Sequence, residues 1–190
     1  MPEPEKLRGG QIVRNSEGRR AMDNLFSLTY EELRRLASFA RRNEANATIS
    51  TTALVHEAWM KLRDSPELGS KSLPHFKSIA ARAMRQVLVD EARRRSARKR
   101  GGAGEVSFVS FDDALSQIVS GNGELLALHE ALEELARLNP RQAQVVVDRF
   151  FGGLSIEEVA GLLDISESAI ERDWRAAKAW LAGRIRPRRE

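Results

Sequence analysis

Charged and polar side chains recur at helical spacing near the C-terminus of the chain. On a helix, residues three and four positions apart share a face, and such a face could enter the major groove of DNA. Arginine pairs with guanine edges or with phosphates, glutamate accepts from cytosine, and a lysine near the end of the helix contacts the backbone. The pattern predicts DNA recognition, with a solvated helix face as the alternative. The face comprises Ser168, Glu171, Arg172, Arg175 and Lys178.

Residues 154–181 supply the elements that would position this face. Asp164 separates two stretches with apolar residues at helical spacing, and a short polar side chain there tolerates left-handed backbone. Ser166 offers a hydroxyl cap for the second stretch. These features predict two short helices joined by a tight turn, a helix-turn-helix. The apolar positions are Ile156, Val159, Ala160 and Leu163 in the first stretch, and Ile170, Trp174, Ala177 and Leu181 in the second.

The densest basic cluster lies in the middle of the chain, at the end of a predicted helix. Basic side chains at this density bind phosphates with strong salt dependence and little sequence preference, although a solvated helix end has the same composition. The net charge of the chain is only +4, so the distribution of the bases matters more than their excess. The cluster comprises Arg93, Arg94, Arg95, Arg98, Lys99 and Arg100.

Several classes of protein are excluded by composition. The 190 residues include no cysteine, which excludes disulfides, thiolate metal sites and cysteine nucleophiles. His56, His75 and His129 fall in different predicted elements without catalytic or metal-ligand spacing, so we expect no enzyme activity, no metal and no cofactor. No apolar run reaches the length of a membrane span, and residues 1–20 lack the apolar core of a signal peptide. We expect a cytoplasmic protein with no membrane partner.

The pattern of apolar residues predicts an all-α protein of two small helical bundles. Helices expected at 23–42, at 51–63 and from residue 74 would form a three-helix bundle over 23–100. Helices at 124–138 and 141–151 would join the helix-turn-helix in a four-helix domain over 124–190. Residues 1–22 are expected to form a flexible polar tail and 101–123 a flexible linker. Trp59, Trp174 and Trp180 lie on apolar faces and are expected to be core anchors.

These pieces, in this order, resemble an extracytoplasmic-function (ECF) sigma factor of bacterial RNA polymerase, in the sigma-70 family. The matching stretches are DNLFSLTYEELRRLASFARR, TTALVHEAWMKL and HFKSIAARAMRQVLVDEARRRSARKR for region 2, and LHEALEELARLNPRQAQVVVDRFFGGLSIEEVAGLLDISESAIERDWRAAKAWL for region 4. The resemblance implies promoter-specific transcription initiation with core RNA polymerase and promoter DNA as partners. An anti-sigma factor is a further expected partner.

The resemblance also implies roles for particular residues. Region 4 would read the minus-35 element through the predicted face of residues 168–178. Region 2 would bind the minus-10 element through Lys77, Arg82 and Arg85 and through the basic cluster of residues 93–100. The same region would dock on the β′ clamp helices of polymerase through its second helix. The expected docking residues are Leu54, Val55, Glu57, Ala58, Trp59 and Leu62.

The chain departs from the family where that second helix begins. Family members carry several acidic residues there, whereas this chain has Ser50, Thr51, Thr52 and Ala53. Phosphorylation would add about 1.5 to 2 negative charges at a helix N-terminus, where the helix dipole favours an anion. We expect a Ser/Thr protein kinase to act at Thr51, with Thr52 as the second candidate and Ser50 as the third, because Ser50 is expected to be the helix cap. Simple capping without modification is the alternative.

Two other functions remain open from the sequence. A stand-alone helix-turn-helix transcriptional regulator would use the first bundle for dimerisation or ligand sensing, but the basic end of that bundle argues against it. A protein that sequesters a sigma factor would not need a basic recognition face.

Overall fold

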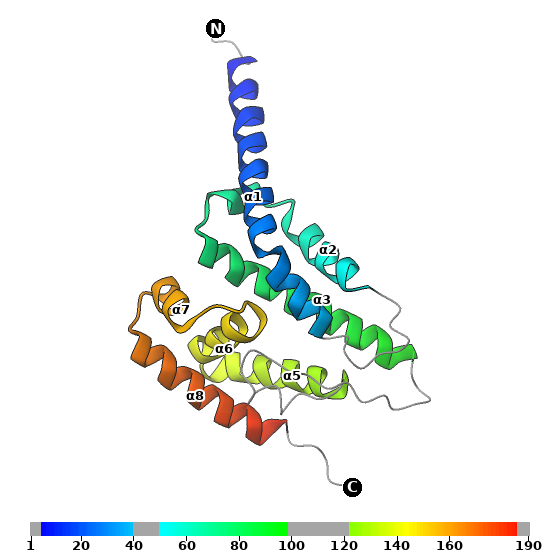
Figure 1. Ribbon diagram of the computed structural model, residues 1–190, viewed down its shortest axis with the longest axis vertical. Helices are drawn as coiled ribbons and strands as arrows, with labels where there is room; N and C mark the ends of the chain where they lie inside the picture. The colour runs from blue at the N-terminus through cyan, green and yellow to red at the C-terminus, as the bar shows by residue number, and fades with distance from the viewer. Residues whose placement is uncertain (1–4, 40–49, 99–121, 186–190) are drawn as a thin grey trace.

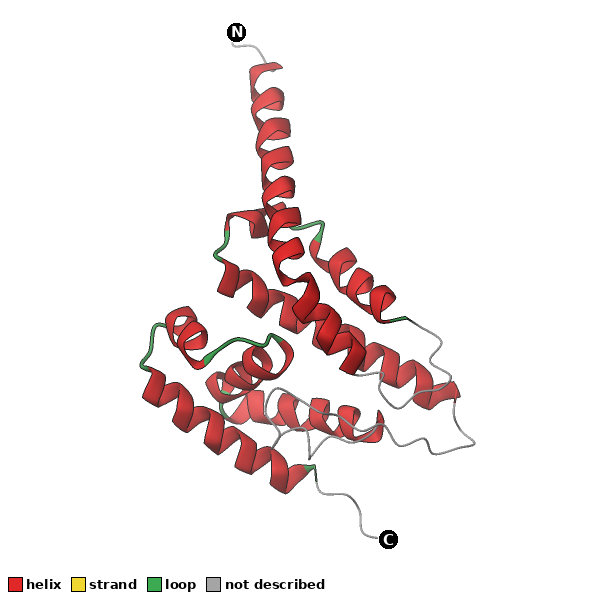
Figure 2. Cartoon of the chain, viewed as in Figure 1, coloured by secondary structure: helices red, strands yellow, loops and turns green. Residues whose placement is uncertain are grey.

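The computed structural model describes residues 5–39, 50–98 and 122–185, and every regular element in these ranges is helical (Figures 1 and 2). The predicted all-α fold is confirmed. The elements of the first half are α1 (Glu5–Phe39), α2 (Thr51–Leu62), the 3₁₀ turn η1 (Pro66–Ser70) and α3 (Leu73–Arg98). Those of the second half are α5 (Asn122–Leu138), α6 (Pro140–Val146), the π-helical turn η2 (Val147–Phe151), α7 (Ile156–Leu163) and α8 (Glu167–Arg184).

The first helix begins much earlier than the sequence predicts. Helix α1 starts at Glu5, so residues 5–22, which we expected to form a tail, are helical. Packing against η1 explains why the helix includes the residues around Gly18 and Met22. Met22 is buried, and a Cβ on Gly69 of η1 would lie 2.2 Å from the carbonyl oxygen of Gly18. Two glycines in contact let the backbones approach this closely.

The first half forms a bundle of α1, α2 and α3 around one apolar core. Ser50 caps α2 by accepting a hydrogen bond from the backbone N–H of Ala53 at 3.1 Å, as expected for this residue. Trp59 of α2 packs against Phe26 of α1 with ring centroids 4.4 Å apart. The largest fully buried side chains of this half include Leu54, Phe76 and Met84.

The second half contains the predicted pair of helices with a tight turn. Asp164 adopts left-handed backbone (φ 54°, ψ 47°) between α7 and α8, as its position in the sequence predicts. Ser155 and Glu158 form a capping box at the start of α7, in which each side chain accepts from the backbone N–H of the other. The Ser-x-x-Glu spacing is a known sequence signal for this cap, and our sequence analysis missed it.

The two halves pack against each other through α3. Helix α3 contacts α5, η2 and α7 of the second half as well as α1 and α2 of the first (Figure 1). The buried apolar residues form one continuous cluster that spans both halves. The two expected bundles are therefore present, and they pack against each other around a shared apolar core. Most of the predicted linker lies outside the described residues.

Candidate nucleic-acid interface

The predicted recognition face lies on the outside of α8. Ser168, Glu171, Arg172 and Arg175 are exposed, and Lys178 is half-buried. Arg175 donates through Nε to the carbonyl oxygen of Glu171 at 3.4 Å, whereas Arg172 makes no hydrogen bond or ion pair within the described parts of the chain. The face carries three cations and one carboxylate, and its geometry suits a partner with phosphates and base edges.

The opposite face of α8 fixes this helix in its domain. Ile170, Trp174, Ala177 and Leu181 are buried, as their spacing predicts. Two cations contact the Trp174 ring: the Arg149 guanidinium carbon is 5.0 Å and the Lys178 ammonium 5.1 Å from the ring centroid. Lys178 therefore contacts Trp174 of its own helix and also belongs to the predicted DNA-binding face.

An ion pair ties α8 to α6 from the side. Arg141 donates from Nε to Asp173 Oδ2 at 2.6 Å and from Nη2 to Oδ1 at 3.3 Å. The Asp173 side chain is only 8% exposed, so this bidentate contact neutralises a nearly buried carboxylate. The start of the helix differs from our expectation: Ser166 occupies the cap position, but its hydroxyl makes no capping bond and lies 3.2 Å from Ser168 Oγ.

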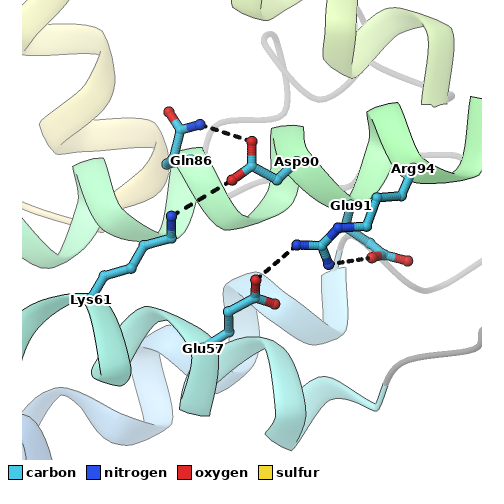
Figure 3. A network of polar contacts seen from close by, with 6 residues as sticks. All are labelled: Glu57, Lys61, Gln86, Asp90, Glu91 and Arg94. Atoms are coloured by element: carbon cyan, nitrogen blue, oxygen red, sulfur yellow. Dashed lines mark hydrogen bonds and ion pairs between the residues drawn. The ribbon is translucent and has the colours of Figure 1, made fainter.

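The basic cluster at the end of α3 is only partly available for DNA. Arg94 donates to Glu57 of α2 at 3.0 Å and to Glu91 at 3.3 Å (Figure 3). Arg94 therefore links α3 to α2, and its expected role as a phosphate contact stays a prediction. Arg93 is exposed. The side chains of Arg95 and Arg98, and all of Lys99 and Arg100, lie outside the described part of the structure.

The three other cations expected to bind DNA contact the second half of the chain in this structure. Lys77 pairs with Glu32 at 3.2 Å and with Glu158 of α7 at 3.3 Å. Arg82 donates to Gln144 of α6. Arg85 donates through Nη2 to the carbonyl oxygen of His129 at 3.2 Å and to Glu133 of α5 at 2.9 Å. In this conformation the side chains of Lys77 and Arg85 are only 11% and 16% exposed, whereas Arg82 is exposed.

The electrostatics of these contacts follow from their burial. Burial by itself lowers the pKa of the Lys77 ammonium, but Glu32 and Glu158 outweigh it and raise the pKa above 10.5. His129 lies 2.8 Å from Arg85 through Nδ1, and because arginine only donates, this nitrogen must accept and the ring is neutral. Burial and the Arg85 charge lower the pKa of His129 below 6.5.

The expected polymerase contacts on α2 are mostly in the core. Leu54, Val55, Ala58 and Leu62 are buried against α1 and α3, so their side chains are not exposed to a partner in this structure, and their role in docking on polymerase stays a prediction. Their apolar spacing signals the inner face of the helix, which the family motif alone does not distinguish from a docking face. The outer face of α2 consists of other residues: Thr52, Ala53, His56, Met60 and Lys61 are exposed, and Thr51, Glu57 and Trp59 are half-buried.

Two further observations bear on function. Within the described ranges, no three His, Cys, Asp or Glu side chains are grouped as a metal site would require. None of the helices that the structure describes is both long and apolar enough to cross a membrane.

The profile of a family described as "ECF sigma factor" matches residues 8–186, which is nearly the whole chain. Neither the curated proteins nor the solved structures gave a match.

Proposed function

We propose, from the premise that this chain belongs to the ECF sigma factor family, that α8 reads the upstream promoter element and that the first half binds polymerase and the opened strand. The family is one of transcription initiation factors that act with core RNA polymerase at promoter DNA. In this proposal residues 23–100 correspond to region 2, residues 124–190 to region 4 and residues 101–123 to their connection.

The observation that carries the proposal is the two-sided construction of α8. Its apolar face is buried, while its other face presents two exposed arginines, Arg172 and Arg175, beside Ser168 and Glu171. The Arg141–Asp173 ion pair and the Trp174 contacts hold the helix to its domain without using these side chains. A helix that is held to its domain by its inner face and presents arginine donors on its outer face supports base-edge recognition in a major groove.

Run-off transcription with purified core polymerase tests this function. We expect specific transcripts only when the chain and core polymerase are both present, because a sigma factor opens duplex DNA as part of the holoenzyme. A gel-shift assay with the chain alone is the control. Tight and sequence-specific duplex binding without polymerase, combined with no run-off product, would instead indicate a stand-alone regulator.

The start of α2 supports a regulated form of this function. Its first turn contains no acidic residue, and Glu57, the nearest carboxylate along the helix, is paired with Arg94. We propose that a Ser/Thr kinase supplies the missing charge at Thr51, with Thr52 as the second candidate. The helix N-terminus favours a phosphate there, and Thr52 is the more exposed of the two residues. Ser50 already serves as the cap.

Binding to core polymerase measures this regulation. The phosphorylated chain should bind core polymerase more tightly than the unmodified chain, and T51A and T52A should separate the two candidate sites. The S50A variant tests the third candidate hydroxyl of the same turn, and because Ser50 caps α2, the stability of this variant is measured alongside its binding. Equal binding by phosphorylated and unmodified chains would contradict the proposal. An anti-sigma factor, the other proposed partner, would be sought by co-purification with the unmodified chain.

A further inference from the structure

A cavity of about 340 Å³ lies between α1 and the end of α2. Its volume falls within the range of pockets that hold small molecules. None of its described lining residues belongs to α3 or to the second half of the chain, so it is separate from the surfaces assigned above to DNA. The lining residues are Arg19, Met22 and Asp23 of α1, Trp59 of α2, and Arg63 and Asp64, which follow α2.

Two packed helices fix the walls of this cavity. Helices α1 and α2 contact each other along the first bundle (Figure 1). Arg19, Met22 and Asp23 are three and four positions apart, so they share one face of α1. Met22 is only 1% exposed and supplies the buried apolar part of the lining. Trp59 is half-buried, and its contact with Phe26, at 4.4 Å between ring centroids, holds the indole against α1.

The charged lining residues are only partly paired. Arg63 Nε lies 3.4 Å from Asp64 Oδ1, and the two side chains are 50% and 79% exposed, so this ion pair is weak. Arg19 and Asp23 are exposed and make no hydrogen bond or ion pair with any residue that the structure describes. The cavity therefore presents an available carboxylate and an available guanidinium beside an aromatic ring.

This combination of side chains fits one class of ligand. An indole stacks on flat heterocycles, and a guanidinium binds phosphate oxygens through parallel N–H donors. A carboxylate only accepts hydrogen bonds and can take two at once. Among the common bases, guanine alone presents two adjacent N–H donors on one edge, at N1 and at the N2 amine. The lining therefore favours a guanine base that carries phosphate.

We propose that this cavity binds a guanine nucleotide. The base stacks on Trp59, Asp23 accepts from N1–H and from the N2 amine, and Arg19 and Arg63 bind the phosphates. The inference stands on the cavity alone and does not depend on the function proposed above.

A guanine base with phosphate has two possible sources, a free nucleotide and a base of the opened DNA strand. The position of the cavity favours the free nucleotide. The cations assigned to the strand, Lys77, Arg82 and Arg85, lie on α3, and none of them lines the cavity.

Fluorescence anisotropy of a ribose-labelled GTP with the full chain measures binding. We expect unlabelled GTP to compete about tenfold better than ATP, because adenine offers the Asp23 carboxylate only one donor group. The D23N variant should bind GTP about tenfold more weakly and should prefer xanthosine triphosphate. Xanthine has an oxygen in place of the N2 amine, and the asparagine amide can donate to that oxygen. A variant that had merely lost structure would not gain this preference.

Matched controls come from exposed positions of the same helix that do not line the cavity. E17Q removes a carboxylate from α1, as D23N does, and R20A removes an arginine beside Arg19. Both controls should bind GTP like the unmodified chain. R19A should lose affinity for GTP but keep its affinity for guanosine, which carries no phosphate.

The outcomes distinguish the ligand, its source and the proposed function. Equal affinity for GTP and ATP, or a D23N variant that behaves like E17Q, would overturn the guanine site. A short oligothymidine with one central guanine is the DNA probe, with a central adenine as its control. If the guanine oligonucleotide bound more tightly than GTP, the free nucleotide would be the wrong ligand. Guanine-specific GTP binding without run-off transcription would leave this site intact and refute only the sigma-factor function.

Discussion

Replacing Arg172 by alanine is the most informative single change on the recognition face. The side chain is exposed and makes no hydrogen bond or ion pair within the described structure, so the chain itself loses no partner. We expect the free energy of unfolding to change by less than about 0.5 kcal/mol. Loss of a bidentate contact to guanine should weaken promoter binding by about 1–3 kcal/mol, or roughly 5- to 150-fold.

Promoter binding by the holoenzyme would be followed by fluorescence anisotropy at several salt concentrations. Substitution of a base contact should relax the sequence preference at one position and leave the salt dependence unchanged, whereas substitution of a phosphate contact should lower the slope by about 1. The matched control is R137A, which removes an exposed arginine from the last turn of α5. Equal losses of affinity in R172A and R137A would refute the assignment of α8 as the reading helix.

Three further predictions concern stability. The S155A variant should lower the free energy of unfolding in urea by about 1 kcal/mol through loss of the α7 capping bond, with S168A, which breaks no capping bond, as the control. The W174A variant should cost about 3–5 kcal/mol because the ring is only 6% exposed, and W174F should recover part of this loss in the same urea titration. His129 should make the free energy of unfolding decrease as the pH falls. Its pKa in the folded chain lies below the unfolded value of 6.5, so its contribution to stability is complete above pH 6.5 and is lost as the pH drops through the lowered pKa. Urea titrations between pH 8 and pH 5 should show this loss in the unmodified chain and not in H129Q, and an identical pH dependence in both would contradict it.

The outer face of α8 could be predicted from the sequence because its signal is local. Residues three and four positions apart share a face whatever the rest of the chain does, so the apolar positions Ile170, Trp174 and Leu181 already define which side is free. The left-handed turn at Asp164 and the cap at Ser50 were predictable for the same reason. Each depends on backbone within a few residues.

The first half shows where local signals mislead. The apolar residues of α2 matched a family docking motif, yet Leu54, Val55 and Ala58 turn inward because α1 and α3 enclose them. Helix α1 extends over residues that carry little apolar periodicity, and its packing on η1 depends on the contact between Gly18 and Gly69, which lie about fifty positions apart in the sequence. No short window of sequence contains both partners of such a contact.

The sequence by itself determined the helical fold, the two-sided α8, the absence of cysteine chemistry and the lack of acidic residues at the start of α2, because each is a property of composition or of spacing within one helix. Only the tertiary structure decided what Lys77, Arg82 and Arg85 do. Exposed cations on an isolated helix are equally suited to a phosphate or to a carboxylate. Here Glu133 and Glu158 approach Arg85 and Lys77 from distant parts of the chain, and the two cations are only 16% and 11% exposed.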